Sequence, residues 1–291
     1  MDLADRFLTV DGVRLHYVET GEGPLVVLLH GFPEFWWSWR HQIPALAAAG
    51  FRVVALDMRG YAQSDSPPNW RDYRGERLAA DVAGVIEQLS DPEVDGGRAH
   101  VVGHDWGAAV AWAVATLHPD RVRRLAILNV PHPETMLRTL RRSPKQLLHS
   151  WYMFFFQIPW LPERLLERAG RRFLEGAYRD ARPGAFTPED LARYEQALLR
   201  SPGGIKGPID YYRAALRQSP KRAQELFRPI AAKVLVIWGE QDRFLSREMA
   251  TPDPVLVPDV RIVRLPDASH WVQHDEPERV STLLTEHLSG A

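Results

Sequence analysis

The sequence predicts an α/β fold in which a mostly parallel sheet is covered by helices on both faces. Short apolar runs, each typical of a strand buried on both sides, alternate with amphipathic helical segments. Strands and helices alternate in this way when parallel strands are joined by helical crossovers. The chain of 291 residues is 45% hydrophobic, which is enough to bury a sizeable core.

Six apolar runs are the expected buried strands, at residues 25–30, 52–57, 99–103, 124–130, 233–238 and 260–264. Residues 13–19 are expected to form an antiparallel strand at the edge of the sheet. Amphipathic spacing predicts helices near residues 39–49, 75–90, 107–118 and 277–288.

The alternation stops between about residues 132 and 228, which are rich in Leu, Arg and aromatic residues and show helical spacing. We expect this segment to form a helical cap over the carboxyl edge of the sheet, where open α/β sheets bind their ligands. The predicted domains are a core of residues 1–131 and 229–291 and a cap of residues 132–228.

Composition argues against several classes of partner and site. The net charge of −1 provides no overall field that would attract nucleic acid or anionic lipid. The absence of cysteine excludes disulfides, thiolate metal sites and a cysteine nucleophile. The first ten residues do not read as a secretory signal, and the most apolar stretch, residues 151–162, is too short to span a bilayer. We therefore expect a cytoplasmic protein with no membrane or nucleic-acid partner.

Chemically active residues follow the predicted strands. The segments are "HGFP" at 30–33, "DMRGY" at 57–61, "GHDWG" at 103–107, "GEQDRF" at 239–244 and "ASHW" at 268–271. Loops at the carboxyl edge of a parallel sheet converge in space, so these segments are expected to share one site.

The segment "GHDWG" places Asp105 between Gly103 and Gly107, which permit a sharp strand-to-helix turn that exposes the central residue. Asp105 could instead be a plain N-cap of the following helix. Its partners favour catalysis, because Asp105, Asp242 and His270 follow one another in the order nucleophile, acid and base that accompanies this turn.

Two of these assignments have neighbours that compete with them. His274 lies four residues beyond His270 and could be exposed near the next helix, whereas His270 directly follows the last strand. Glu240 is an alternative to Asp242. The other place for an acid, after the strand at 124–130, holds Asn129, which cannot serve as a carboxylate.

Two backbone amides are suited to an oxyanion hole. One is the N–H of Phe32 in "HGFP", and the other is the N–H of Trp106, which follows Asp105. A tight turn that simply needs Gly31 and Pro33 is compatible with this role, because the turn aims the amide. We predict a cis Phe32–Pro33 bond for the same reason.

The sequence resembles the soluble epoxide hydrolases of the α/β-hydrolase superfamily over nearly its whole length. The resemblance implies an α/β-hydrolase fold with a helical cap inserted after the sixth strand, Asp105 as nucleophile, His270 as base and Asp242 as the acid that orients it. One departure is Ala62, where the family usually has glycine. The segments that carry the resemblance are "LLHGFPEFWWSWR", "ALDMRGYAQSD", "VVGHDWGA", "LNVPHP", "WGEQDRF" and "ASHWVQHDEP".

The resemblance also implies two cap tyrosines that activate the epoxide oxygen. "YMFFFQIP" places the first at Tyr152, although a tyrosine in this apolar run could simply pack in the cap. "GPIDYYR" places the second at Tyr212, with the adjacent Tyr211 as an alternative. The expected lining of the substrate pocket includes Pro33, Trp36 and Phe156.

An aspartate suits this chemistry better than a serine. An epoxide carbon is sp³, so a serine would form an ether, whereas Asp105 would form an ester that water can cleave with His270 as general base. The tyrosines would supply a proton to the leaving oxygen, and the product would be a vicinal diol. This scheme needs a small apolar epoxide and water, with no metal or cofactor. The sequence leaves the oligomeric state open, a homodimer included.

Two other functions compete with this one. A haloalkane dehalogenase uses the same aspartate, but its halide needs N–H donors rather than an acid. Trp106 would suit either enzyme, whereas Phe32, where dehalogenases often carry asparagine, and the tyrosine pair favour the epoxide hydrolase. A non-catalytic receptor on the same scaffold would have no need of Asp105, Asp242 and His270 together.

Overall fold

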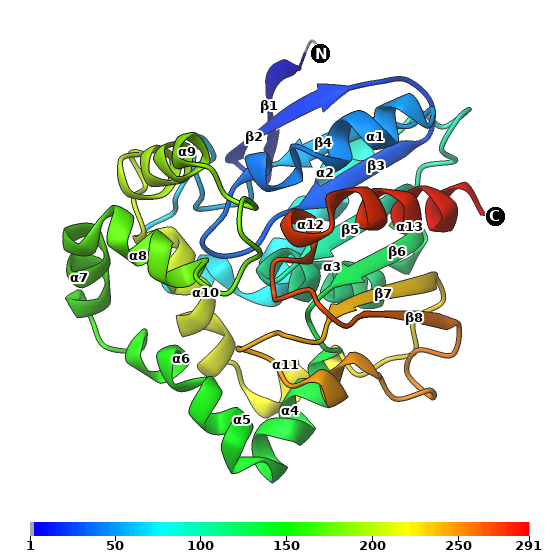
Figure 1. Ribbon diagram of the computed structural model, residues 1–291. Coiled ribbons are helices and arrows are strands. Elements are labelled where there is room, and N and C mark those ends of the chain that lie inside the picture. Colours follow the sequence, from blue (N-terminus) through cyan, green and yellow to red (C-terminus); the bar gives the residue numbers. More distant parts are fainter. Residues whose placement is uncertain (1–2, 291) are drawn as a thin grey trace.

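The computed structural model describes residues 3–290 and contains an eight-stranded sheet between helices (Figure 1). The strand order is β1-β2-β4-β3-β5-β6-β7-β8. β2 pairs antiparallel with both β1 and β4, and all remaining neighbours pair in parallel. The strands are β1 (Ala4–Val10), β2 (Val13–Thr20), β3 (Leu25–Leu29), β4 (Arg52–Leu56), β5 (Ala99–His104), β6 (Val122–Leu128), β7 (Lys233–Gly239) and β8 (Val260–Leu265).

The predicted fold class is confirmed, and each predicted strand is present. β2 is antiparallel, as predicted, but it is not the edge strand, because β1 pairs with its outer side. β1 is the one strand of the described residues that sequence reasoning did not anticipate. It lies at the edge of the sheet and exposes most of its side chains, among them Arg6 and Phe7, so it lacks the apolar run that marks the buried strands.

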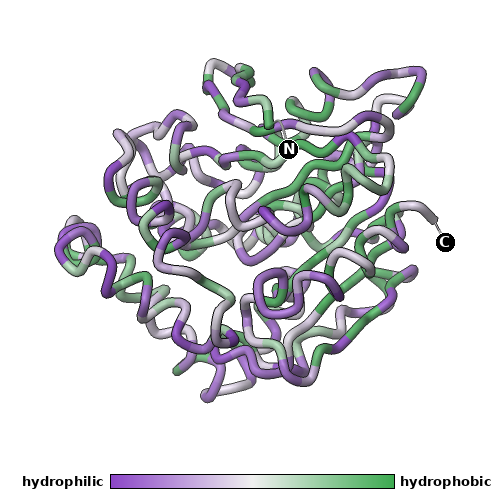
Figure 2. Tube along the Cα trace, turned by 45° about the horizontal axis from the view of Figure 1, so that its top comes forward, coloured by the Kyte–Doolittle hydropathy of each residue, from purple (hydrophilic) through white to green (hydrophobic). Residues whose placement is uncertain are grey.

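The sheet separates two hydrophobic cores because side chains alternate between its faces. In β3 every residue is buried, with Val27 and Leu29 facing one core and Val26 and Leu28 facing the other. Figure 2 shows hydrophobic residues gathered along the strands of the sheet. Helices α2 (Gly75–Leu89) and α3 (Trp106–Leu117) supply the first core, and α1 (Gln42–Ala48) and α13 (Pro277–Ser289) the second.

Between β6 and β7 the described chain is helical, as the sequence predicts. We call this segment the helical insert. One of its hydroxyl groups, on Tyr178, donates a 2.7 Å hydrogen bond to the Pro33 carbonyl at the carboxyl edge of the sheet. Its helices are α4 (Pro133–Arg142), α5 (Pro144–His149), α6 (Trp151–Phe155), α7 (Leu161–Ala169), α8 (Arg171–Ala177), α9 (Pro188–Leu199), α10 (Lys206–Leu216) and α11 (Pro220–Glu225).

The remaining helices are short. They are α12 (Val272–Asp275) and the 3-10 helices η1 (Trp36–Trp39), η2 (Trp70–Tyr73), η3 (Pro119–Arg121) and η4 (Arg247–Ala250). Within residues 3–290, each helix is too short or too polar to cross a bilayer.

Two backbone details concern predictions from the sequence. The Phe32–Pro33 peptide bond is cis, as predicted. Ala62 has a φ of +45°, in the left-handed region that favours glycine. The turn at "RGYA" therefore keeps a glycine-type conformation although the residue is alanine.

Candidate active site

Asp105 occupies a sharp turn between β5 and α3. Its φ of +47° and ψ of −123° are rare for a residue with a side chain. Close packing makes the surrounding glycines necessary. A Cβ atom on Gly107 would lie 2.1 Å from the Leu29 carbonyl oxygen, and one on Gly31 would lie 2.3 Å from the Cβ of Asp105. The turn therefore requires glycine on both sides of the carboxylate.

The carboxylate of Asp105 does not cap α3, because its side chain makes no capping hydrogen bond. Instead, the Phe32 N–H donates to Oδ1 at 2.7 Å, and the His270 Nε2 lies 3.5 Å from Oδ2. Burial acts to raise the pKa of Asp105, but the hydrogen bond and charge of His270 outweigh it and lower that pKa. Among the described residues, the Trp106 N–H makes no hydrogen bond to this carboxylate.

His270 is buried between two carboxylates. Its Nδ1 lies 2.7 Å from Oδ2 of Asp242, and its Nε2 faces Asp105. Burial acts to lower the pKa of His270. The charges of Asp242 and Asp105 and their hydrogen bonds act in the opposite direction and raise the pKa to about 10. With both carboxylates ionised, the imidazole is therefore cationic at neutral pH.

Asp242 is held in place by three hydrogen bonds besides the one to His270. Oδ1 accepts from the backbone N–H groups of Phe244 and Leu245 at 2.7 and 3.0 Å. Oδ2 accepts from Nδ2 of Asn129 at 2.7 Å. Asn129 follows β6, at the place that sequence reasoning rejected for the acid because an amide is no carboxylate. Its position shows instead that it orients the carboxylate of Asp242, which follows β7.

The competing residues point elsewhere. Glu240 lies 3.4 Å from Arg264 in an ion pair and makes no hydrogen bond to His270 in the described chain. His274 is buried rather than exposed, which corrects the expectation from the sequence. Its Nε2 lies 2.6 Å from Oε1 of Glu34, and burial lowers the pKa of His274 to about 4 despite this carboxylate. The ring is therefore neutral.

Glu34 is a buried carboxylate beside the site that sequence reasoning missed. Its Oε2 lies 2.9 Å from Nδ1 of His104, whose Nε2 is 2.9 Å from the backbone carbonyl of His270. Burial acts to raise the pKa of Glu34, but His274 and His104 outweigh it and hold that pKa well below its usual range. The only sequence signal was its place directly after "HGFP", which does not show that its partners are histidines.

Tyr152 from α6 and Tyr212 from α10 come together above Asp105. Their ring centroids are 5.8 Å apart, and both line the same cavity as Asp105 and His270. Burial, followed by the charge of Asp105, raises the pKa of both phenols well above the ordinary value, so both are proton donors in the neutral form. Tyr211 is excluded from this pair, because its hydroxyl donates to the Arg59 carbonyl at 2.8 Å.

The cavity has a volume of about 600 Å³. Pro33 and Phe156 line it, as predicted, but Trp36 does not. Trp36 begins η1, and its backbone N–H donates to Oδ1 of Asp57. The residue lines a separate depression instead of the cavity. Of the twenty residues that line the cavity, nine are Phe, Tyr or Trp; besides Phe156 and the two tyrosines they are Phe32, Trp151, Phe155, Phe173, Phe244 and Trp271.

Comparison with known proteins places the chain among hydrolases. A family model described as "alpha/beta hydrolase fold" matches residues 24–277. The chain is 39% identical to the AB hydrolase superfamily protein YfhM of Bacillus subtilis, over 98% of each chain. It is 37% identical to Epoxide hydrolase 4 of Homo sapiens, over 94% of this chain and 75% of that protein.

Solved structures give the same result. Epoxide Hydrolase A from Mycobacterium thermoresistibile superimposes with a TM-score of 0.82 at 33% identity, covering 99% of both chains. The Bacillus megaterium epoxide hydrolase bound to an inhibitor gives 0.84 at 31% identity, covering 98% of this chain and 100% of the other. The resemblance stated from the sequence is thereby confirmed.

Proposed function

Because the chain belongs to the α/β-hydrolase fold family, we propose that it is an epoxide hydrolase that converts small apolar epoxides to vicinal diols. One observation carries the proposal. A cavity with an aromatic lining contains a carboxylate at a strained turn, on Asp105, facing a histidine and two neutral phenols. The named epoxide hydrolases among the similar proteins support the same reaction.

The first step is the opening of the ring. Oδ2 of Asp105 attacks an epoxide carbon, the carbon–oxygen bond breaks, and a phenol of Tyr152 or Tyr212 donates a proton to the leaving oxygen. Oδ1 already accepts from the Phe32 N–H. The product is a hydroxyalkyl ester whose carbonyl oxygen, Oδ1, faces that amide.

Esterification then changes the charge of His270. While Asp105 is ionised, it helps to hold the pKa of His270 at about 10. The ester is uncharged, so this contribution disappears and the pKa falls. The proton that leaves the ring restores the phenol, and His270 becomes a neutral imidazole that can act as general base.

The second step is hydrolysis of the ester. His270 takes a proton from water, and the hydroxide attacks the acyl carbon of Asp105. The negative charge develops on Oδ1, where the amides of Phe32 and Trp106 form the oxyanion hole; one such donor contributes roughly 2.7–4 kcal/mol. The bond between the acyl carbon and the diol oxygen then breaks, and that oxygen takes the proton of the added hydroxyl. The diol leaves, Asp105 is again a carboxylate, and His270 keeps the proton that it took from water. Asp242 holds the imidazole throughout.

In this scheme residues 132–228 act as the cap, since they supply both phenols, and residues 1–131 and 229–291 supply the nucleophile, base, acid and oxyanion hole. The site therefore needs both the cap and the core. The phenols come from α6 and α10, whereas Asp105 and His270 lie at strand ends.

A trapped intermediate tests the proposal. With styrene oxide, we expect His270→Gln to form the ester but not to hydrolyse it, so intact-mass spectrometry should show a gain equal to one whole substrate. Asp105→Ala is the control and should show no gain. A parallel assay of halide release from a bromoalkane distinguishes a dehalogenase. No adduct on His270→Gln, or halide release without diol formation, would contradict the proposal.

A further inference from the structure

The outer side of the helical insert carries an apolar surface. Of the eleven large apolar side chains exposed in the described chain, seven lie between residues 147 and 165. Soluble proteins rarely leave such side chains clustered in water unless the surface binds something. We call this cluster the outer apolar face; it consists of Leu147, Leu148, Trp151, Phe154, Ile158, Trp160 and Leu165.

The spacing shows that this face is not a by-product of core packing. Leu147 in α5 and Trp151 and Phe154 in α6 follow one another at intervals of four and three residues, which places them on one side of the α5–α6 segment. The opposite side of the same segment already packs inward and lines the cavity, through Tyr152 among others. The segment is therefore apolar on two sides, and its outer side has no partner among residues 3–290.

The outer apolar face also reaches the entrance of the cavity. Leu148 and Trp151 belong to the face and line the cavity at the same time. Trp151 is 60% exposed and Trp160 65% exposed, which are large values for tryptophan. An apolar molecule held against this face would lie next to the entrance.

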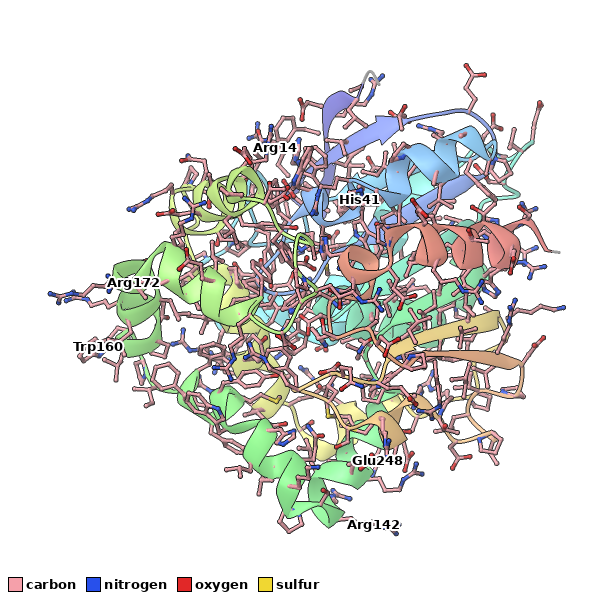
Figure 3. The ribbon with its side chains drawn as sticks, viewed as in Figure 1. Arg14, His41, Arg142, Trp160, Arg172 and Glu248 are labelled. Carbon is pink, nitrogen blue, oxygen red and sulfur yellow. The ribbon has the colours of Figure 1, made fainter. Side chains whose placement is uncertain are left out.

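The surroundings of the face are strongly basic. Residues 138–172 contain eight Arg and Lys and only two Glu, although the whole chain has a net charge of −1. Figure 3 shows Arg172 and Trp160 close together at the left margin of the molecule and Arg142 at its lower margin, all on the outside of the insert. In this segment Arg138 and Arg171 have acidic partners. The cations without an ion pair to any described residue are Arg141, Arg142, Lys145, Arg164, Arg168 and Arg172.

We propose that the outer apolar face docks on the surface of an anionic lipid bilayer, with its apolar side chains in the headgroup region and the basic side chains on lipid phosphates. Exposed Trp, Phe and Leu surrounded by Lys and Arg are what such interfacial binding requires. The overall charge predicted no membrane partner. The local charge differs because the acidic residues lie in other parts of the chain.

A second copy of the chain fits this face less well. In a two-fold dimer the same patch from each subunit meets itself, so the basic rim would face an identical basic rim. Anionic lipid instead neutralises it. The proposal goes beyond the proposed function, because membrane docking can be measured without any substrate. Failure of vesicle binding would leave the epoxide hydrolase proposal intact, and absence of hydrolase activity would leave the docking proposal intact.

Vesicle flotation of the whole protein tests the proposal. We expect binding to vesicles of phosphatidylcholine with phosphatidylserine, and weak binding to phosphatidylcholine alone. Raised salt should weaken the binding, because it screens surface charge. No binding to the anionic vesicles, or equal binding to both kinds, would overturn the proposal.

Matched variants locate the contact. Phe154→Ser with Trp160→Ser should weaken binding about tenfold or more. Arg141→Gln with Arg142→Gln should weaken it about 25-fold, because each basic residue near an anionic surface contributes a factor of about five. The controls are Val255→Ser, at a side chain 74% exposed between β7 and β8, and Arg123→Gln, at an exposed residue of β6.

Thermal unfolding midpoints check that each variant is folded. We expect these midpoints to be unchanged, because the substituted side chains lie at the surface. Reduced binding by the face variants but not by the controls supports the proposal. Equal loss in all four variants contradicts it. Sedimentation analysis tests the alternative that the face binds a second copy of the chain. That alternative would replace the proposal if the unmodified protein did not bind vesicles but formed a dimer, and if the changes at Phe154 and Trp160 abolished that dimer.

Discussion

His270 lies between two carboxylates, and only one of them changes its charge in the proposed reaction. Asp242 lies 2.7 Å from Nδ1 and forms no bond to the substrate, while Asp105 becomes an ester at the other side of the ring. A cationic imidazole cannot accept a proton, so the residue can act as a base only after the first step. The two half-reactions are thereby kept in order by electrostatics rather than by movement.

The first prediction tests this dependence. Asp105→Asn imitates the uncharged ester, so the pKa of His270 should fall below its value of about 10 in the unmodified protein. The imidazole titration followed by NMR measures this pKa. Glu240→Gln is the control, because Glu240 pairs with Arg264 and should leave the titration unchanged. An identical pKa in Asp105→Asn and the unmodified protein would be incompatible with the account.

The second prediction concerns the phenols. Tyr152→Phe and Tyr212→Phe should each slow ester formation by about tenfold or more, and the double variant by 10²–10⁴-fold, about the full contribution of a general acid. Tyr211→Phe is the matched control, because its hydroxyl bonds to a backbone carbonyl outside the cavity. Rapid-quench measurement of ester formation gives the rates. Full rates in both single variants would exclude this role.

The sequence locates some site residues better than others. Asp105, Asp242 and His270 can be predicted together, because their loops follow strands of one parallel sheet and must converge. Tyr152 and Tyr212 need the family resemblance, since a tyrosine in an apolar run is indistinguishable from a packed one.

Other residues could not be predicted, because their roles depend on distant partners. Glu34 is defined by His104 and His274, which lie 70 and 240 residues away in the chain. Asn129 is defined by Asp242, 113 residues away. Trp36 was wrongly expected in the pocket because proximity in sequence to Pro33 does not fix the direction of a side chain.

At the level of elements, the turn before α3 and the "HGFP" loop are packed against each other. Gly31 lies so close to Asp105 that a Cβ atom at position 31 would collide with the Asp105 side chain. The next residue, Phe32, donates its backbone N–H to Oδ1 of Asp105. The loop must therefore approach this closely for the amide of Phe32 to reach the carboxylate.

The third prediction follows from this contact. Gly31→Ala should displace the loop, weaken the bond from Phe32 to Asp105 and lower kcat by about 10²–10³-fold, the cost of losing one oxyanion donor. Overpacking should also destabilise the fold by about 1–3 kcal/mol. Gly75→Ala is the control, because a Cβ there meets no atom within 4 Å. Steady-state kinetics and urea unfolding measure both effects, and unchanged kcat in Gly31→Ala would be the contrary result.

Elements differ in how well the sequence predicts them. β3 and β7 have continuous apolar runs, because both faces of the sheet are covered. β1 has no such run, since it is an edge strand open to solvent. The helical insert is recognisable from its spacing, but its helices could not be counted, because short helices separated by single residues, such as α5 and α6, share one continuous pattern.

For the molecule as a whole, the raised pKa of His270 links stability to pH. The folded protein binds this proton more tightly than the unfolded chain does. The contribution to stability is therefore fully present below about pH 6.5, the ordinary pKa of histidine, and is lost as the pH rises through about 10.

The fourth prediction uses this window. The free energy of unfolding should decrease between pH 6.5 and 10, and it should decrease less in Asp105→Asn, whose His270 has a smaller shift to lose. Urea unfolding at several pH values measures both curves. Subtracting one curve from the other removes the contributions of the titrating groups that both proteins share and leaves the contribution of His270. Parallel curves over this window would show that Asp105 does not sustain the charge on His270.

The central claim is that substrate becomes bonded to the protein and that water later attacks the acyl carbon. One turnover in ¹⁸O-labelled water, with enzyme in excess over epoxide, tests it most directly. We predict a diol whose new oxygen is ¹⁶O, donated by the carboxylate of Asp105, with ¹⁸O retained in that side chain. A first-turnover diol that carries ¹⁸O would mean direct attack of water on the epoxide and would contradict the account.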